Sequence, residues 1–319
     1  MAEPDSKRRS WRLKAASGLV VLALQSACGS SPTEPTPVRS PVVAAKPSPS
    51  PSPSPSPTPT PQPRVALITI DGLRADAVSA ETTPKIWDLV SRGAYTFRAQ
   101  TIFPSNTLPS HTSMLTGVEP SVHGVTFDEY SQTFQFSTPT ALSLVHAAGK
   151  RSVMIVGKDK FQQIVPTGTV DTFKVVKAGD VDVVNEAITE VQATGFDLLF
   201  VHLPQVDQVG HYSGWMSPEY MAQVLTADEQ VGRLVSYLPV GTTVIVTSDH
   251  GGAQKVHGTT APTDLTIPWI VVGPRVTHKG GISRNVRTTD TAATILAVLG
   301  ITAPNNCTGK TVSEIFDTP

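Results

Sequence analysis

Six side chains of the kinds that bind transition-metal ions follow short apolar runs of the sequence. Asp71 comes directly after the apolar run 65–70, and the others come after two later runs. These others are Asp207, His211, Asp249, His250 and His257. Carboxylates and imidazoles are the ligands that zinc and similar divalent ions prefer. One ion cannot use six such ligands, so the set predicts two ions about 3.5 to 4 Å apart, an arrangement that stabilises both oxygens of a phosphoryl displacement.

Each of these residues, taken alone, has a simpler interpretation. Asp71-Gly72 is typical of a turn with a helix cap, and Asp207 with His211 is also typical of a capping residue and a surface histidine. Taken together they are hard to explain as independent turns, because glycines also lie beside them. These glycines are Gly72, Gly210, Gly251 and Gly258. The joint pattern therefore favours a metal site.

A threonine just before a predicted helix is the candidate nucleophile. Pro109 suits the first turn of a helix, and Thr107 lies just ahead of it. Free N–H groups and the helix dipole favour phosphate at such a position, and a metal-bound hydroxyl there is an activated nucleophile. Thr107 alone is equally typical of a capping residue. Thr101 and Ser110 are alternative hydroxyls.

The elements that must position these residues alternate along the chain. Apolar runs predict buried strands at 65–70, 152–156, 197–202, 242–247 and 267–272. Helical patterns between them cover 83–91, 109–116, 139–148, 180–194, 218–237 and 289–299. This alternation predicts an α/β fold with a mostly parallel central sheet and helices on both faces. In such sheets ligands bind beyond the carboxyl ends of the strands, where the candidate ligands lie.

The first 63 residues differ in composition from the rest of the chain. Residues 1–28 combine a basic start with a 13-residue apolar run at 15–27, a pattern typical of an export signal. Cys28-Gly29 resembles a bacterial lipobox, which favours a cell-surface lipoprotein attached through lipid on Cys28 over a plainly secreted protein. Residues 29–63 hold 13 of the 28 prolines, a composition that predicts a disordered Pro/Ser-rich linker. Residues 64–319 are then the catalytic domain.

Charge and cysteine usage exclude other classes of protein. Residues 64–319 contain 18 Lys and Arg against 23 Asp and Glu, a formal charge of −5, which argues against a nucleic-acid-binding surface. The chain has 2 cysteines, Cys28 and Cys307, too few for a disulfide framework. Any phosphate chemistry here would therefore depend on metal ions rather than on a basic field.

The ordered motifs resemble the alkaline phosphatase superfamily, and most of all its type I phosphodiesterase/nucleotide pyrophosphatase branch. The matching motifs are Asp71-Gly72-Leu73-Arg74, Thr107-Leu108-Pro109-Ser110-His111, His123-Gly124-Val125, Asp207-Gln208-Val209-Gly210-His211, Ser248-Asp249-His250-Gly251 and Val256-His257-Gly258. The resemblance implies an alkaline phosphatase-like domain with two divalent ions, zinc being the expected metal. It implies that one ion binds Asp207, His211 and His257. The other would bind Asp71, Asp249, His250 and the Thr107 oxygen.

The same resemblance implies a reaction and a class of substrate. Thr107 would attack phosphorus to form a phosphothreonine, which water then hydrolyses, and the substrate would be a small phosphodiester or nucleotide. Asp128 stands where nucleotide pyrophosphatases have an asparagine that contacts phosphate, and Lys158 and Lys160 resemble a substrate-binding pair of phosphonoacetate hydrolases. Two alternatives remain. One is a phosphonate or phosphomonoester hydrolase with the same site, and the other is a non-catalytic surface binding module.

Overall fold

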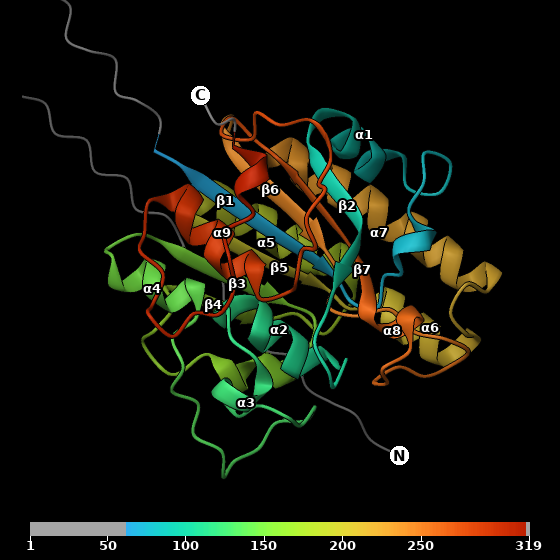
Figure 1. Ribbon diagram of the computed structural model, residues 1–319, viewed down its shortest axis with the longest axis horizontal. Coiled ribbons are helices and arrows are strands. Elements are labelled where there is room, and N and C mark those ends of the chain that lie inside the picture. The colour runs from blue at the N-terminus through green and yellow to red at the C-terminus, as the bar shows by residue number, and fades with distance from the viewer. Residues whose placement is uncertain (1–61, 317–319) are drawn as a thin grey trace, which may run out of the picture. The chain divides into compact units, whose positions relative to one another are not determined.

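Eight strands form one sheet in the part of the chain that the structure, a computed structural model, describes, residues 62–316 (Figure 1). Their order across the sheet is β4-β3-β5-β1-β6-β7-β2-β8. The strands are β1 (Arg64–Ile70), β2 (Ala94–Gln100), β3 (Ser152–Val156), β4 (Thr172–Val175), β5 (Leu198–Leu203), β6 (Thr242–Thr247), β7 (Thr266–Val272) and β8 (Gly280–Gly281). The five predicted strands correspond to β1, β3, β5, β6 and β7.

The sheet is mostly parallel, which confirms the predicted fold class. β1 lies between β5 and β6 and pairs with both in parallel, and β3 pairs in parallel with β4 and β5. β7 is the exception, because it runs antiparallel to both β6 and β2. The segment between β6 and β7 contains a helix of only four residues, Pro262–Leu265. A parallel return usually passes through a full helix, which this segment lacks, and this agrees with the antiparallel pairing.

Helices cover both faces of the sheet. They are α1 (Pro84–Arg92), α2 (Thr107–Thr116), α3 (Pro120–His123), α4 (Ala141–Ala147), α5 (Asp180–Thr194), α6 (Gln205–Ser213), α7 (Pro218–Tyr237), α8 (Pro262–Leu265) and α9 (Asp290–Leu299). Short 3-10 turns are η1 (Ala75–Ala77), η2 (Asp159–Ile164) and η3 (Ser313–Ile315). Apolar residues of α2, α4 and α9 share one buried cluster, and those of α1, α5 and α7 share the other.

Strand β1 shows how the two clusters are divided. Its residues are fully buried from Val65 onward, and alternate side chains point to opposite faces of a strand. Val65 and Leu67 therefore join the cluster of α2, α4 and α9, whereas Ala66 and Ile68 join that of α1, α5 and α7. A central strand that is buried on both faces must be apolar throughout, which is why the sequence predicts this strand.

Two strands of more than two residues, β2 and β4, were not predicted. In β2 the exposed Arg98 interrupts the apolar pattern, and no residue of β4 is fully buried. Within residues 62–316, no helix is both long and apolar enough to cross a membrane. The predicted export signal, the lipid site at Cys28 and nearly all of the predicted linker lie outside the described residues.

Candidate metal centre and active site

The candidate ligands meet because three neighbouring strands end at the same edge of the sheet. Asp71 follows β1, Asp207 and His211 lie in α6 directly after β5, and His250 follows β6. Gly72 is part of this convergence: its φ is +69°, and a Cβ on it would lie 3.0 Å from the Cα of Asp207. Only glycine adopts this backbone conformation readily and lets the two loops approach so closely.

The first predicted ligand set comes together in space. The potential ligand atoms of Asp207, His211 and His257 all lie within 4.8 Å of one another. The Oδ1 atom of Asp207 lies 3.4 Å from Nε2 of His211 and 3.5 Å from Nε2 of His257. Asp207 and His211 are four residues apart in α6, so they share one face of that helix.

The second predicted set is arranged differently around Asp207. Asp71, Asp207 and His250 form a second group whose potential ligand atoms lie within 4.8 Å of one another. Asp249 is adjacent, with Oδ2 3.3 Å from Nε2 of His250, while its Oδ1 accepts a hydrogen bond from the Gly72 N–H at 3.1 Å. Asp207 therefore belongs to both groups, which the resemblance did not imply.

Three histidines of the site are oriented in the same way, by a backbone carbonyl at Nδ1. Nδ1 of His211 lies 3.0 Å from the carbonyl oxygen of Lys255, Nδ1 of His257 lies 2.9 Å from that of Ser105, and Nδ1 of His250 lies 2.8 Å from that of Gly251. A carbonyl oxygen only accepts, so each Nδ1 donates, and Nε2 is the ring nitrogen that faces the carboxylates. Backbone carbonyls orient metal-binding histidines in this way.

Three buried polar atoms of the site have no hydrogen-bond partner. They are Oδ1 of Asp207, Oδ2 of Asp249 and Nε2 of His250. Buried polar atoms are nearly always paired, and an unpaired one costs free energy, so an unpaired cluster requires an explanation. Carboxylate oxygens and imidazole nitrogens are the atoms that divalent metal ions bind, and bound ions would give all three a partner. The residues present therefore fit divalent metal ions.

The electrostatics of the cluster also favour a cation. Burial would raise the pKa of Asp71, but the charge of the Lys158 ammonium and the hydrogen bond from His202 hold it well below its usual value. Burial and the Asp71 charge raise the pKa of Asp249 to about 7. Burial lowers the pKa of His257 to about 4, which leaves its imidazole neutral and able to bind a metal.

Thr107 is buried beside both groups. It is the first residue of α2, which begins two residues earlier than predicted, and its Oγ1 lies 3.4 and 3.5 Å from the two Asp71 oxygens. Nζ of Lys158 lies 3.2 Å from the same Oγ1. The two alternative hydroxyls, Thr101 and Ser110, instead hydrogen-bond to each other at 3.3 Å.

The predicted substrate-binding residues occupy two places. Lys158 lies among the ligands, with Nζ 2.7 Å from Oδ2 of Asp71 and 2.7 Å from Oδ2 of Asp207. Asp128 accepts the N–H of Leu108 at the start of α2 at 2.8 Å, and it forms an ion pair with Lys160 at 2.8 Å. The carboxylate of Asp128 therefore already has two donors, one of them at the helix N-terminus beside Thr107.

Two buried histidines next to the ligands were not singled out from the sequence. His202 in β5 accepts from the Gly157 N–H at Nδ1, at 3.3 Å, so its Nε2 donates to Oδ2 of Asp71 at 2.8 Å. His111 in α2 bonds the Thr107 carbonyl through Nδ1 at 2.8 Å and faces Thr69 Oγ1 through Nε2 at 3.0 Å. Both position other site residues. A histidine inside an otherwise apolar strand was the available signal for His202.

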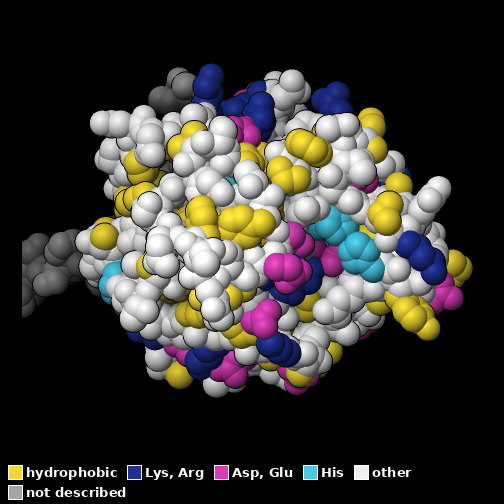
Figure 2. Space-filling view, turned by 90° about the horizontal axis from the view of Figure 1, so that it is seen from below, with side chains coloured by type: hydrophobic (Ala, Val, Ile, Leu, Met, Phe, Trp, Pro, Cys, Tyr) yellow, Lys and Arg dark blue, Asp and Glu magenta, His cyan; other side chains and the backbone are white. Residues whose placement is uncertain are grey.

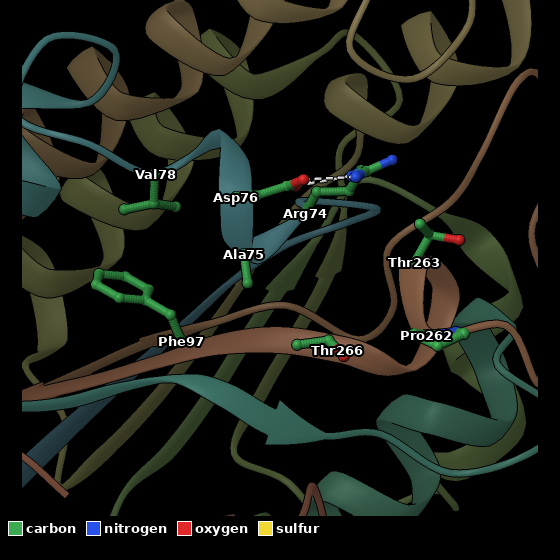
Figure 3. Close-up of a pocket in the computed structure, with 8 residues that line it drawn as sticks. All are labelled: Arg74, Ala75, Asp76, Val78, Phe97, Pro262, Thr263 and Thr266. Carbon is green, nitrogen blue, oxygen red and sulfur yellow. Dashed lines mark hydrogen bonds and ion pairs between the residues drawn. The ribbon is translucent and has the colours of Figure 1, made fainter.

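Figure 2 shows histidine and acidic side chains beside one another on one face of the molecule, with a basic side chain next to them. A pocket of about 440 Å³ lies elsewhere, lined by residues of η1, β2 and the β7 region. Its lining includes no candidate ligand, and the guanidinium of Arg74 there pairs with Asp76 (Figure 3). This pocket is therefore separate from the candidate ligand groups.

Known proteins resemble this chain in sequence and in fold. The catalytic subunit of human GPI ethanolamine phosphate transferase 2 is 26% identical to this chain over 277 residues. The match covers 80% of this chain and 28% of that protein. A 2,3-bisphosphoglycerate-independent phosphoglycerate mutase of Idiomarina loihiensis is 30% identical over 138 residues, 41% of this chain and 26% of the mutase. The chain thus spans about a quarter of the length of these curated relatives.

A solved structure of murine ectonucleotide pyrophosphatase/phosphodiesterase 5, an inactive form in complex with AMP, has the same fold. Its TM-score is 0.68 at 15% identity, over 80% of this chain and 100% of that one. The sequence model of the type I phosphodiesterase/nucleotide pyrophosphatase family matches residues 65–263, more than half of the chain. The protein therefore belongs to the type I phosphodiesterase/nucleotide pyrophosphatase family, whose members are at family level phosphoester hydrolases.

Proposed function

We propose that this protein is an exported, zinc-dependent hydrolase of phosphodiesters, nucleotides included, that works through a phosphothreonine on Thr107. The observation that carries the proposal is the shared direction of three imidazoles. The Nδ1 atoms of His211, His250 and His257 each bond a backbone carbonyl, so their Nε2 atoms point toward Asp207, and the hydroxyl of Thr107 lies at the same edge of the sheet.

The chain's residues divide between two ions in this proposal. Asp207, His211 and His257 would hold one ion. The other ion would be held by a set of residues that lie at the ends of β1 and β6 and at the start of α2. This set is Asp71, Asp249, His250 and Thr107 Oγ1. Two such ions would make the threonine hydroxyl a stronger nucleophile and stabilise negative charge on the phosphoryl oxygens.

Thr107 then performs the chemistry in two displacements. Its Oγ1 forms a bond to phosphorus while the bond from phosphorus to the leaving oxygen breaks. The threonine proton passes to solvent, and the leaving oxygen takes a proton from solvent. In the second displacement a water oxygen bonds to phosphorus and gives up a proton to solvent, while the bond from phosphorus to Oγ1 breaks and Oγ1 regains a proton from solvent.

Other residues of the chain keep Thr107 in position. The carbonyl of Thr107 accepts from His111, and the side chain lies at the N-terminus of α2, where helix N–H groups favour anionic oxygens. His202 holds Asp71 through a buried hydrogen bond of 2.8 Å. These contacts leave the reactive oxygen buried and oriented before any substrate arrives, which reduces the reorganisation needed for reaction.

A phosphonate or phosphomonoester hydrolase is the second candidate. The observation that favours it is the position of Lys158, whose ammonium lies 3.2 Å from Thr107 Oγ1. A cation there would attract a more highly charged substrate than a diester monoanion. A third candidate is transfer of the phosphoryl group to an alcohol instead of to water, because the human relative is named as an ethanolamine phosphate transferase.

The test compares rates on three substrates after metal removal and zinc restoration. With bis-nitrophenyl phosphate, nitrophenyl phosphate and phosphonoacetate, we expect chelation to abolish turnover, zinc to restore it, and the diester to be preferred. Activity that resists the chelator would contradict the metal centre. Preference for phosphonoacetate would support the second candidate, and two bound ions without turnover would support a binding module.

Thr107→Ala tests the nucleophile directly. We expect it to lose at least about a thousandfold in kcat, as other enzymes do without their nucleophile, while it keeps its zinc. Ser110→Ala is the matched control, because Ser110 is equally buried in α2 but bonds only Thr101 by its side chain among the described contacts. A near-normal rate in Thr107→Ala would transfer the role to another hydroxyl.

Export and lipid attachment form a separate part of the proposal, since Cys28 lies outside the described residues. In a bacterial host we expect the protein to take up a radiolabelled fatty acid and to be found with membranes. Cys28→Ser should release it in soluble form. Equal labelling of both forms would place any lipid elsewhere.

A further inference from the structure

Lys158 occupies the space between the two candidate ligand groups. Its Nζ lies 2.7 Å from Oδ2 of Asp71 and 2.7 Å from Oδ2 of Asp207. Asp207 belongs to both groups and Asp71 to the second. The ammonium therefore pairs with the same carboxylates that would bind divalent ions. The other ion pairs that these two aspartates make within residues 62–316 involve histidines.

We propose that Lys158 is an internal cation that competes with metal ions for Asp71 and Asp207. This inference rests on the proposed metal centre. In the metal-free protein the ammonium would balance part of the charge of three buried aspartates. When ions bind, their charge displaces the ammonium from the two carboxylates, and its side chain is then free to contact a phosphoryl oxygen near Thr107.

Charge balance supports this role. Asp71, Asp207 and Asp249 are all buried, and buried carboxylates without a cation are costly. Lys158 is itself largely buried, with 16% of its side chain exposed, so its charge also needs these partners. A divalent ion would bring a stronger field to the same two carboxylates, whose Oδ1 atoms face the candidate ligand histidines while their Oδ2 atoms contact Lys158. An ammonium left between two such ions would be repelled by both.

The backbone allows the exchange. Lys158 directly follows Gly157, which comes just after β3. The Gly157 N–H donates to Nδ1 of His202 in β5, so the Cα of Lys158 is fixed near the site. The side chain above it is flexible and carries a single charged group. Movement of the ammonium therefore does not require movement of the strand.

Lys160 provides a matched control two residues along the chain. It is similarly buried, with 13% of its side chain exposed, but its ammonium pairs with Asp128 and Glu129 instead of with the candidate ligands. Removing its charge changes the general field of the site by a comparable amount. It does not free either carboxylate that Lys158 contacts.

The experiment measures zinc affinity on the purified full chain by competition with a chromophoric chelator, and thermal unfolding in excess chelator. For Lys158→Met we expect zinc to bind at least about tenfold more tightly, a change of 1.4 kcal/mol. The chelated variant should unfold at a lower temperature than the chelated wild type. Lys160→Met should leave zinc affinity unchanged, and Lys158→Arg, which keeps the charge, should bind zinc about as wild type does.

The opposite signs of the two effects make the test specific. A lysine that only contacts substrate would leave zinc affinity unchanged in Lys158→Met, and a lysine that only supports the fold would lower both zinc affinity and stability. Either result would overturn the inference while the metal centre stands. If the wild type binds no zinc, the proposed metal centre fails and the inference with it.

Discussion

Hydrogen bonds to the ring nitrogens separate two kinds of histidine in this molecule. His257 gives its Nδ1 proton to a backbone carbonyl and presents Nε2 to the cluster, whereas His202 accepts at Nδ1 and donates from Nε2 to Asp71. His123, buried nearby in α3, follows the second pattern, since it accepts from the Val125 N–H and so donates to Ser113. Residue type alone does not distinguish these roles, but the direction of one hydrogen bond does.

At the residue scale, Asp128 places a negative charge beside the candidate nucleophile. Its carboxylate bonds the Leu108 N–H beside Thr107, where an anionic substrate would approach. For Asp128→Asn we expect kcat/KM on a diester to rise about threefold to tenfold, because the amide oxygen still accepts from Leu108 while about 1 kcal/mol of repulsion is removed. The measurement is steady-state kinetics on bis-nitrophenyl phosphate.

Glu129→Gln is the control for this change. Glu129 also pairs with Lys160, at 3.4 Å, but its side chain is 88% exposed. The control should therefore leave kcat/KM within about twofold, because exposed charges are screened by solvent. An unchanged or lower value in Asp128→Asn would show that the carboxylate does not oppose substrate binding.

At the scale of elements, a tryptophan connects the loops that carry the ligands. Trp215, just after α6, donates from its indole N–H to the Gly72 carbonyl at 2.9 Å and contacts His211 edge-on, with ring centroids 5.1 Å apart. A Cβ on Gly252 would come within 2.3 Å of this indole. The loop after β6 therefore needs a glycine where it passes Trp215.

Gly252→Ala tests this packing. We expect the variant to lose about 1 to 3 kcal/mol of unfolding free energy, as overpacked sites do, and to bind zinc more weakly because the indole and His211 shift. Chemical denaturation and zinc titration would measure both. Gly281→Ala is the control, since a Cβ there meets nothing within 4 Å. Equal stability of the two variants would contradict the packing argument.

Three helices meet at another buried carboxylate, Asp180 at the start of α5. It accepts from the Gln205 N–H of α6 at 3.0 Å and from the Gln223 amide of α7 at 3.0 Å. Burial raises the pKa of Asp180 to about 6, although both hydrogen bonds favour the charged form. The folded state therefore binds this proton more tightly than the unfolded chain, whose aspartates titrate near about 4.

The resulting pH dependence has a definite sign. Because the folded pKa is the higher one, Asp180 makes the unfolding free energy fall as pH rises from about 4 to about 6. Asp180→Asn should remove this fall, so the variant should gain up to about 3 kcal/mol relative to wild type between pH 4 and pH 7.5. Denaturation in chelator would measure it. Asp182→Asn, exposed in the same helical turn, should show no such gain.

At the scale of the whole molecule, both faces of the sheet carry their own buried cluster within residues 62–316. We expect the segment 64–319 to fold alone and to unfold in one transition at the temperature of the full chain. Zinc at a hundred times its Kd should add about 2.7 kcal/mol to either form by mass action. Thermal unfolding with and without zinc is the measurement. A segment without a cooperative transition, or one that zinc does not stabilise, would contradict the predicted domain boundary.

Much of the fold could be predicted because the central strands are buried on both faces. Such strands are continuous apolar runs, and β1, β5 and β6 are bounded by polar residues at the edge where function lies. The half-exposed β2, the short β4 and the antiparallel direction of β7 were not predicted. These features depend on pairing with neighbours far away in the chain, which local patterns do not encode.

The sequence by itself determined which residues could do chemistry, because their types and their places after the strands are local properties. Tertiary structure alone decided three further points. Asp207 contributes to both ligand groups, Lys158 lies between two carboxylates, and Asp128 bonds the start of α2. Each depends on residues from separate helices and loops meeting at one edge of the sheet, where distances of a few ångströms determine which charges pair.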